Sequence, residues 1–94
     1  MTTPKNQTLM WEARCDPGKG TALEEWLRTT IIPTLWQDEQ VASYNAYTSK
    51  APDADRLVIV IDYLTTAPTT LPTEPPPHLL ARPAHTWVFQ RLDM

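Results

Sequence analysis

Four side chains of this sequence fit acid–base or hydrogen-bonding chemistry by type and position: Asp62, His78, Asn45 and Tyr47. Asp62 ends the most apolar run of the chain. A segment that covered it would make its carboxylate bind a proton more tightly, and therefore make it a usable general base. Asn45 and Tyr47 share one face of an alternating stretch, where an amide and a phenol orient a ligand oxygen. His78 is a candidate because imidazole exchanges protons near neutral pH.

A second set of side chains is suited to contacting a ligand. Aromatic rings supply large apolar surfaces, and a guanidinium group clamps a carboxylate through paired hydrogen bonds. These candidates are Trp36, Tyr44, Arg82, His85 and Trp11, with Tyr44 replacing Tyr47 if its strand has the opposite face inward. Each of these residues also has an alternative structural role. Tryptophans pack in the core, phenols are exposed on an edge strand, loop histidines are solvated, and an arginine can hold the chain in place.

The sequence has no pattern for a metal or an organic cofactor. His78 and His85 are separated by Pro83 and do not have the spacing of metal ligands. Cys15 is the single cysteine, which excludes an internal disulfide and a cysteine-cluster metal site. Two glycines are too few for a phosphate-binding loop, and no nucleophile elbow is present. We therefore expect chemistry without a cofactor.

Composition limits the classes of partner. The chain has 94 residues, which predicts a single domain over 1–94. A net charge of −3 with scattered basic residues disfavours nucleic acid, which requires a clustered basic surface. No stretch approaches the roughly 20 apolar residues of a membrane-spanning helix. Residues 1–6 lack the apolar core of a signal peptide and are predicted as a loose tail, so we expect a cytoplasmic protein.

Periodicity predicts a strand and then a helix in the first half of the chain. Residues 7–15 alternate between apolar and polar types, which indicates a strand with one apolar face. After turn-forming residues at 16–20, Thr21 and Glu24 have the spacing of a capping box at a helix start. Pro33 predicts a kink or a second short helical turn. The apolar stripe of this helix recurs every four residues, at Leu23, Leu27, Ile31 and Leu35.

The most apolar stretch, 56–64, predicts the strand around which the domain is organised. Its centre, Leu57–Ile61, has no polar residue on either face, so we expect both faces of the sheet to be covered there. Residues 41–48 also alternate, but both faces are mixed, and the sequence leaves open which face points inward. A loop over 49–55 would join the two strands into a hairpin. Since one helix covers one face, we expect a second copy of the chain to cover the other.

Six of the ten prolines fall between 65 and 83. Consecutive prolines favour polyproline II and exclude a helix interior. Only one strand, 86–92, follows this segment and must return to the sheet, so we predict an ordered wrap with at most one helical turn, at 78–82. The predicted fold is α+β: a ferredoxin-like split βαβ arrangement with a four-stranded antiparallel sheet, the first and third strands central, and the wrap in place of the second helix.

This layout resembles the dimeric α+β barrel superfamily, ferredoxin-like proteins that include the antibiotic biosynthesis monooxygenases. The resemblance covers about 7–64 and 85–92 and rests on Trp11-Glu12-Ala13-Arg14, Pro17-Gly18-Lys19-Gly20, Ile31-Ile32-Pro33-Thr34-Leu35 and the hairpin through 56–64. It implies a homodimer whose two sheets form a barrel with the helices outside. It also implies a pocket between sheet and helices for a bulky aromatic or polyketide-like substrate, often without a cofactor. The second long helix of the superfamily is absent here.

Together these observations favour a small tailoring enzyme of secondary metabolism, a cofactor-independent oxygenase or a cyclase/isomerase. In the oxygenase, Asn45, Tyr47 and a histidine would hold a substrate phenolate that itself reduces dioxygen. In the cyclase, Asp62 or His78 would move the proton. The alternative is a non-catalytic small-molecule-binding or dimerisation module, and a third reading makes 71–77 an exposed polyproline docking segment. A shared cavity would favour the enzyme if its walls were Trp36, Tyr47, His78 and Asp62.

Overall fold

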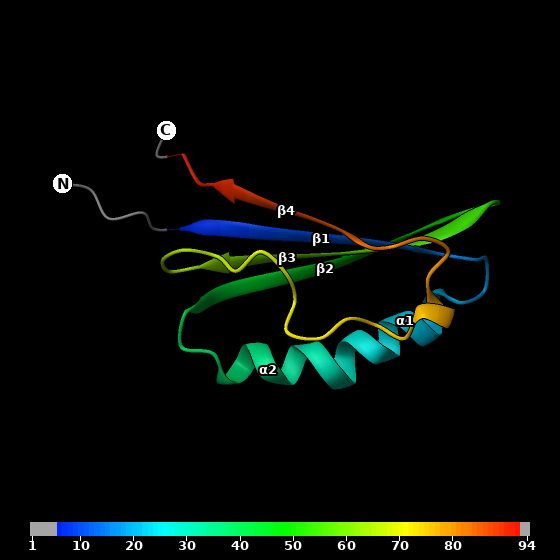
Figure 1. Ribbon diagram of the computed structural model, residues 1–94, viewed down its shortest axis with the longest axis horizontal. Coiled ribbons are helices and arrows are strands. Elements are labelled where there is room, and N and C mark those ends of the chain that lie inside the picture. The colour runs from blue at the N-terminus through cyan, green and yellow to red at the C-terminus, as the bar shows by residue number, and fades with distance from the viewer. Residues whose placement is uncertain (1–5, 93–94) are drawn as a thin grey trace.

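A computed structural model describes residues 6–92, which form one sheet with a helix and a Pro-rich segment beside it (Figure 1). The predicted loose tail lies outside these residues except for Asn6, whose backbone N–H donates to the Leu64 carbonyl at 3.2 Å. No helix within 6–92 is long and apolar enough to cross a membrane. In chain order the elements are β1 Gln7–Cys15, α1 Gly20–Trp26, the π-helical turn η1 Leu27–Ile31, α2 Ile32–Gln37, β2 Val41–Ala51, β3 Ala54–Tyr63, the 3₁₀ turn η2 Pro77–Leu79 and β4 His85–Gln90.

The four strands form one antiparallel sheet in the order β2-β3-β1-β4. The first and third strands are therefore central, as predicted. Their register sets Leu9 opposite Ile61 and Trp11 opposite Ile59, so the apolar faces of both strands point to the same side. The α+β class is confirmed, and this strand order is compatible with a ferredoxin-like fold.

α1, η1 and α2 follow one another directly and make one helix with a wider turn in its middle. A π turn spaces the hydrogen bonds more widely, just ahead of Pro33, whose missing N–H and ring do not fit a regular ladder. Pro33 therefore does not end the helix, and α2 carries Trp36 into its last turn. The predicted stripe is buried against the sheet: Leu23, Leu27, Ile31 and Leu35.

The helix start differs from the prediction. Lys19 is the N-cap residue and no side chain of the helix caps it, so the capping box of Thr21 and Glu24 is wrong. The cap comes from a distant strand instead, because the Asp55 carboxylate on β3 accepts the backbone N–H groups at the helix start. A capping box is a local pattern, whereas this contact depends on how β3 lies beside the turn.

The hairpin is tighter than the sequence predicts. β2 continues to Ala51 and β3 begins at Ala54, and these two residues are paired across the strands. Only Pro52 and Asp53 connect them, so the predicted loop over 49–55 is wrong. The strands continue because backbone pairing to a central strand stabilises even the polar residues Ser49 and Lys50.

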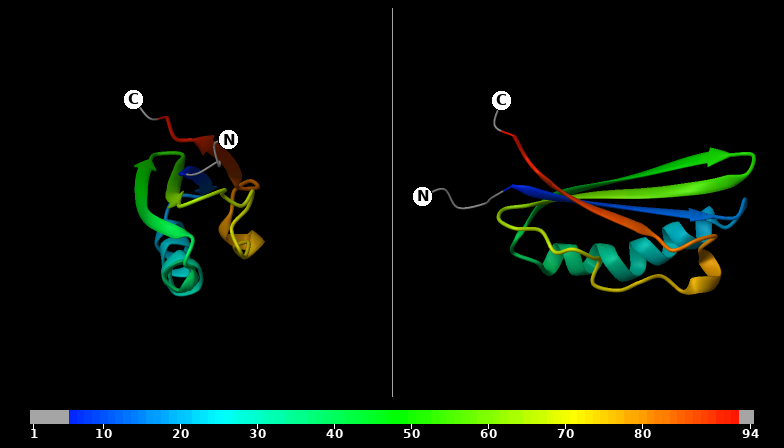
Figure 2. Two further views of the ribbon diagram at one scale, coloured as in Figure 1. Left: turned by 90° about the vertical axis from the view of Figure 1, so that its left-hand side faces the viewer. Right: turned by 45° about the horizontal axis from the view of Figure 1, so that its top comes forward.

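The core lies between the sheet and the helix, and the opposite face of the sheet is bare (Figure 2). We call this second surface the open face. Val58 and Val60 point to it and are half-buried, whereas their neighbours on β3 face the core and are buried. The two-sided burial predicted for 57–61 is thus only half realised within one chain. Trp87 and Phe89 on β4 are large apolar side chains that are exposed on the open face.

The Pro-rich segment lies beside the helix, on the same side of the sheet (Figure 2). Leu71 and Pro75 are buried, and the Ala81 N–H donates to the Arg14 carbonyl at 2.8 Å. Its only regular helical structure is η2, which begins at Pro77. These contacts hold the segment against the domain along much of its length.

Candidate functional site

A groove of about 490 Å³ separates the helix from the edge strand β2. The helix contributes apolar side chains from successive turns, and β2 contributes the residues that alternate toward the helix. Most of this lining is apolar, which suits a bulky organic ligand. The lining residues are Glu24, Leu27, Arg28, Ile32, Trp36, Tyr44, Ala46, Tyr47, Thr48 and Leu57.

The register of β2 decides which of its side chains enter the groove. Tyr44 pairs with Ile61 and Ala46 pairs with Ile59, and both of these partners face the core. Tyr44 and Ala46 therefore point toward the helix, and the small Ala46 leaves space between them. Tyr47 alternates to the other face, yet it also contributes to the lining at this sheet edge. The sequence did not decide which face of β2 points toward the helix, and the structure shows that it is the face that carries Tyr44.

Trp36 and Tyr44 form the polar contact of the groove. The Trp36 indole N–H donates to the Tyr44 hydroxyl oxygen at 2.8 Å. Since that oxygen is the acceptor, the Tyr44 O–H hydrogen remains available to a ligand oxygen. Trp36 is 73% exposed despite its size, so most of its ring is open to whatever enters. At the rim, Arg28 and Glu24 form an ion pair of 3.1 Å one helical turn apart.

Asp62 and Asn45 belong to the open face, on the other side of the sheet from the groove. Asp62 Oδ1 accepts the Thr8 hydroxyl at 2.7 Å, and Oδ2 accepts the Ser43 hydroxyl at 3.1 Å. Asn45 pairs with Val60 and shares its face. The structure therefore brings Trp36, Tyr44 and Tyr47 to one groove but keeps Asp62 and Asn45 apart from them.

The histidines and Arg82 lie at the Pro-rich segment and at β4. His78 is in η2, where its carbonyl accepts the Lys19 ammonium group at 3.2 Å. The His85 ring stacks on Trp87 with a centroid distance of 5.7 Å. Arg82 forms an ion pair with Glu12 at 3.4 Å. None of these three candidates lines the groove between helix and β2.

Trp11 is a core residue. It is almost fully buried, and its ring packs against Trp26 with centroids 6.0 Å apart. Its indole nitrogen has no hydrogen-bond partner within residues 6–92. Trp11 therefore supports the helix from beneath rather than lining the groove.

A second cavity, of about 520 Å³, lies at the Pro-rich segment. Arg82 is the one candidate residue in its lining, and no aromatic ring takes part. A cavity without aromatic walls is the weaker site for an aromatic ligand. Its lining residues are Glu74, Pro75, Pro77, Leu80, Arg82, Pro83 and Ala84.

Cys15 and Tyr63 are buried outside the groove, and both have a raised pKa. Burial raises the pKa of the Cys15 thiol, and the nearby carboxylates of Asp55 and Asp16 raise it further. Burial also raises the pKa of the Tyr63 phenol, with a smaller contribution from Asp38. Both groups are therefore held in their neutral form, which makes Cys15 a poor nucleophile.

The sequence predicts the aromatic part of the groove but not its other walls. Leu27 and Ile32 were assigned to the helix, but their role as a groove wall depends on how far β2 stands from the helix. Ala46 and Thr48 could have been identified from the sequence, since they follow Tyr44 at intervals of two residues and so share its face of the strand. Choosing that face over the other required the pairing of β2 with β3.

No protein-family model matches this sequence, and no curated protein matches it either. Within residues 6–92, no three His, Cys, Asp or Glu side chains are grouped so that they could hold a metal ion. The assignment thus rests on the geometry of the chain itself. That geometry is a small α+β domain, compatible with a ferredoxin-like fold, with an aromatic groove between its helix and the edge strand β2.

Proposed function

We propose that this protein binds a bulky aromatic or polyketide-like small molecule in the groove between the helix and β2. The observation that carries the proposal is the pair of Trp36 and Tyr44, which sets a large exposed ring beside a hydroxyl donor. The ring stacks on the flat apolar part of the ligand, and Tyr44 donates to a carbonyl or phenolic oxygen of the ligand. Leu27 and Ile32 form the apolar wall of the groove.

A tailoring reaction on the bound molecule is the second candidate function. It is favoured by the direction of the hydrogen bond from Trp36, which leaves Tyr44 as a donor to a ligand oxygen. A donor at that oxygen stabilises an enolate or phenolate, the species through which a cofactor-independent oxygenase or a cyclase would proceed. Glu24 is the carboxylate in the lining, and its pairing with Arg28 holds it at the rim.

We further propose that two copies pair through their open faces, as in a dimeric α+β barrel. Trp87 and Phe89 on β4 are 42% and 48% exposed. Met10, Val58 and Val60 continue this apolar surface across the central strands and are half-buried. A two-sheet interface would remove these side chains from water, and the groove on the helix side of each sheet would stay accessible.

The binding proposal is tested with 1-naphthol, a fused aromatic ring with one hydroxyl group. Its dissociation constant is measured by NMR titration for the wild type and for Trp36→Ala and Tyr44→Phe. Losing the stacking ring is expected to weaken binding about tenfold, and losing one hydrogen bond about fivefold. Trp87→Phe, on the open face, serves as the matched control and should leave the constant within about twofold. Equal constants for all four proteins would refute the assignment of the groove.

A further inference from the structure

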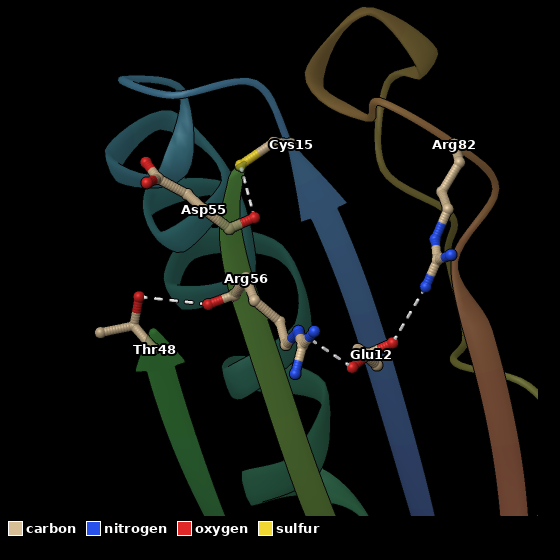
Figure 3. Close-up of polar contacts among 6 residues, drawn as sticks. All are labelled: Glu12, Cys15, Thr48, Asp55, Arg56 and Arg82. Carbon is tan, nitrogen blue, oxygen red and sulfur yellow. Dashed lines mark hydrogen bonds and ion pairs between the residues drawn. The ribbon is translucent and has the colours of Figure 1, made fainter. Parts of the chain in front are cut away.

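Glu12 lies between two arginines on the open face of the sheet (Figure 3). Its Oε2 pairs with the Arg56 Nε at 3.2 Å, and its Oε1 accepts a terminal N–H of Arg82 at 3.4 Å. Each contact uses one nitrogen of the guanidinium group, whereas an arginine that saturates a carboxylate binds it through two. Within residues 6–92 neither arginine has a second side-chain partner, so most of their N–H donors are unused.

Arg14 adds a third guanidinium group to this cluster. It is directly opposite Arg56 in the register of β1 and β3. Its chain neighbours Ala13 and Cys15 are buried in the core, so strand alternation places Arg14 on the open face. The Arg14 Nε is buried and has no hydrogen-bond partner in the described part of the chain.

This arrangement is electrostatically incomplete. Like charges directly opposite one another on antiparallel strands destabilise the pair, and a buried N–H without an acceptor adds to that cost. The cluster has three arginines against one glutamate, Glu12, in a chain whose net charge is −3. Arg82 is held beside β1 because the preceding Ala81 N–H donates to the Arg14 carbonyl at 2.8 Å. The surplus positive charge is therefore built into the fold.

We propose that Arg14, Arg56 and Arg82 form a binding site for an oxyanion, the phosphate or carboxylate group of a small molecule. Such a group supplies acceptors for the Arg14 Nε and for the unused donors of Arg56 and Arg82. Its negative charge also relieves the repulsion between the paired arginines. Glu12 lies between Arg56 and Arg82 and competes with the oxyanion for one donor of each arginine. This site is on the opposite side of the sheet from the groove, so it does not depend on the ligand proposed there. It lies on the open face, toward the end of β1 that carries Arg14 and away from Trp87 and Phe89, so the proposed pairing of two copies must leave that end of the sheet uncovered.

The site is tested by titrating the full chain with inorganic phosphate and, separately, with acetate, at constant ionic strength set by chloride. The readout is the Nε–H cross-peak of each arginine in ¹H–¹⁵N NMR spectra, and the Arg14 signal is assigned from its loss in Arg14→Gln. We expect the Arg14 and Arg56 signals to shift in a saturable way. A tighter constant for phosphate indicates a phosphate ligand, and a tighter constant for acetate indicates a carboxylate ligand.

The variants separate binding from a structural role. Arg56→Gln and Arg14→Gln should each weaken the phosphate constant about tenfold, and Arg56→Lys should weaken it severalfold because the fork of donors is lost. Arg91→Gln removes an equal charge at an exposed position just beyond β4 and is the control. Glu12→Gln should tighten the constant, since it removes the competing carboxylate.

Two outcomes would overturn the proposal. The first is arginine signals that respond to phosphate no more than to chloride. The second is a combination of two results. Glu12→Gln binds phosphate no more tightly than the wild type, and Arg14→Gln changes the association of two copies but not the phosphate constant. If Arg14→Gln fails to fold, Arg56→Lys and Glu12→Gln still give opposite expected shifts and decide the question.

Discussion

Asp55 holds the start of the helix from the neighbouring strand, and removing its carboxylate tests this reading of the fold. The side chain is 4% exposed, and its Oδ2 accepts the Gly18 N–H at 3.2 Å and the Gly20 N–H at 3.1 Å. Gly18 has a φ of +89°, a conformation that glycine adopts without strain, so the turn can bring its N–H to the carboxylate. Asp55→Ala leaves both donors without this acceptor.

The expected loss follows from the two hydrogen bonds. A missing N-terminal cap costs about 1 kcal/mol, and a second bond to a charged acceptor about 1.5 kcal/mol, together about 2.5 kcal/mol of the free energy of unfolding. For a domain of this size that lowers the melting temperature by roughly 10–20 °C. Asp55→Asn keeps an oxygen acceptor and loses only the charge, so its loss should be about 1 kcal/mol.

Urea unfolding followed by tryptophan fluorescence measures these differences. Asp53→Ala is the control, because Asp53 is an exposed residue of the adjacent hairpin turn and should change the free energy of unfolding by less than about 0.5 kcal/mol. An Asp55→Ala protein as stable as the Asp53→Ala protein would refute the idea that β3 caps the helix. The order wild type, Asn variant, Ala variant would support it.

Three further results are expected. Gly20→Ala places a Cβ 2.7 Å from the Asp55 carboxylate oxygen and should destabilise the wild type more than it destabilises Asp55→Ala, a coupling that a double-mutant cycle in urea measures. The pKa values of Cys15 and Tyr63 are raised in the folded chain, so the stability that their neutral forms contribute is complete below the unfolded pKa values and is lost as pH rises through the folded ones. The urea midpoint should therefore fall at alkaline pH, and it should fall less in Cys15→Ala. Trp87→Asp should shift a dimer toward monomer in sedimentation velocity, and wild type that sediments as a monomer at high concentration would contradict the proposed pairing of open faces.

Most of the secondary structure could be predicted from the sequence because it depends on local periodicity. The alternation over 7–15 and the stripe from Leu23 to Leu35 each bury one face against the same core, so pattern and tertiary structure agree. The hairpin 49–55 was predicted poorly because its polar residues are stabilised by pairing with a central strand, which a local pattern does not reveal. The cap by Asp55 also depends on contact between distant segments.

The candidate site was predictable only in its residue types. Trp36 ends a helix and Tyr44 begins an edge strand, and their hydrogen bond follows from how these two elements meet. The faces of β2 were ambiguous because most of its side chains are exposed on both sides, so no apolar face marks the inward direction. Asp62 was a candidate because it ends an apolar strand. In the structure both of its carboxylate oxygens accept hydroxyl groups on the open face, one from β1 and one from β2.

The Pro-rich segment explains why the open groove lies at β2. Leu71 and Pro75 are buried, and the segment that carries them lies beside the helix on the same side of the sheet (Figure 2), so it covers the part of the core next to the helix. A polyproline-rich chain has no internal hydrogen-bond ladder, so its order here comes from its contacts with the rest of the domain. Its contacts, including the Ala67 N–H donated to the Gln7 side chain at 2.9 Å, leave the β2 side of the helix uncovered. The exposed aromatic ring of Trp36 is on that uncovered side, where a ligand would replace the water that now contacts it.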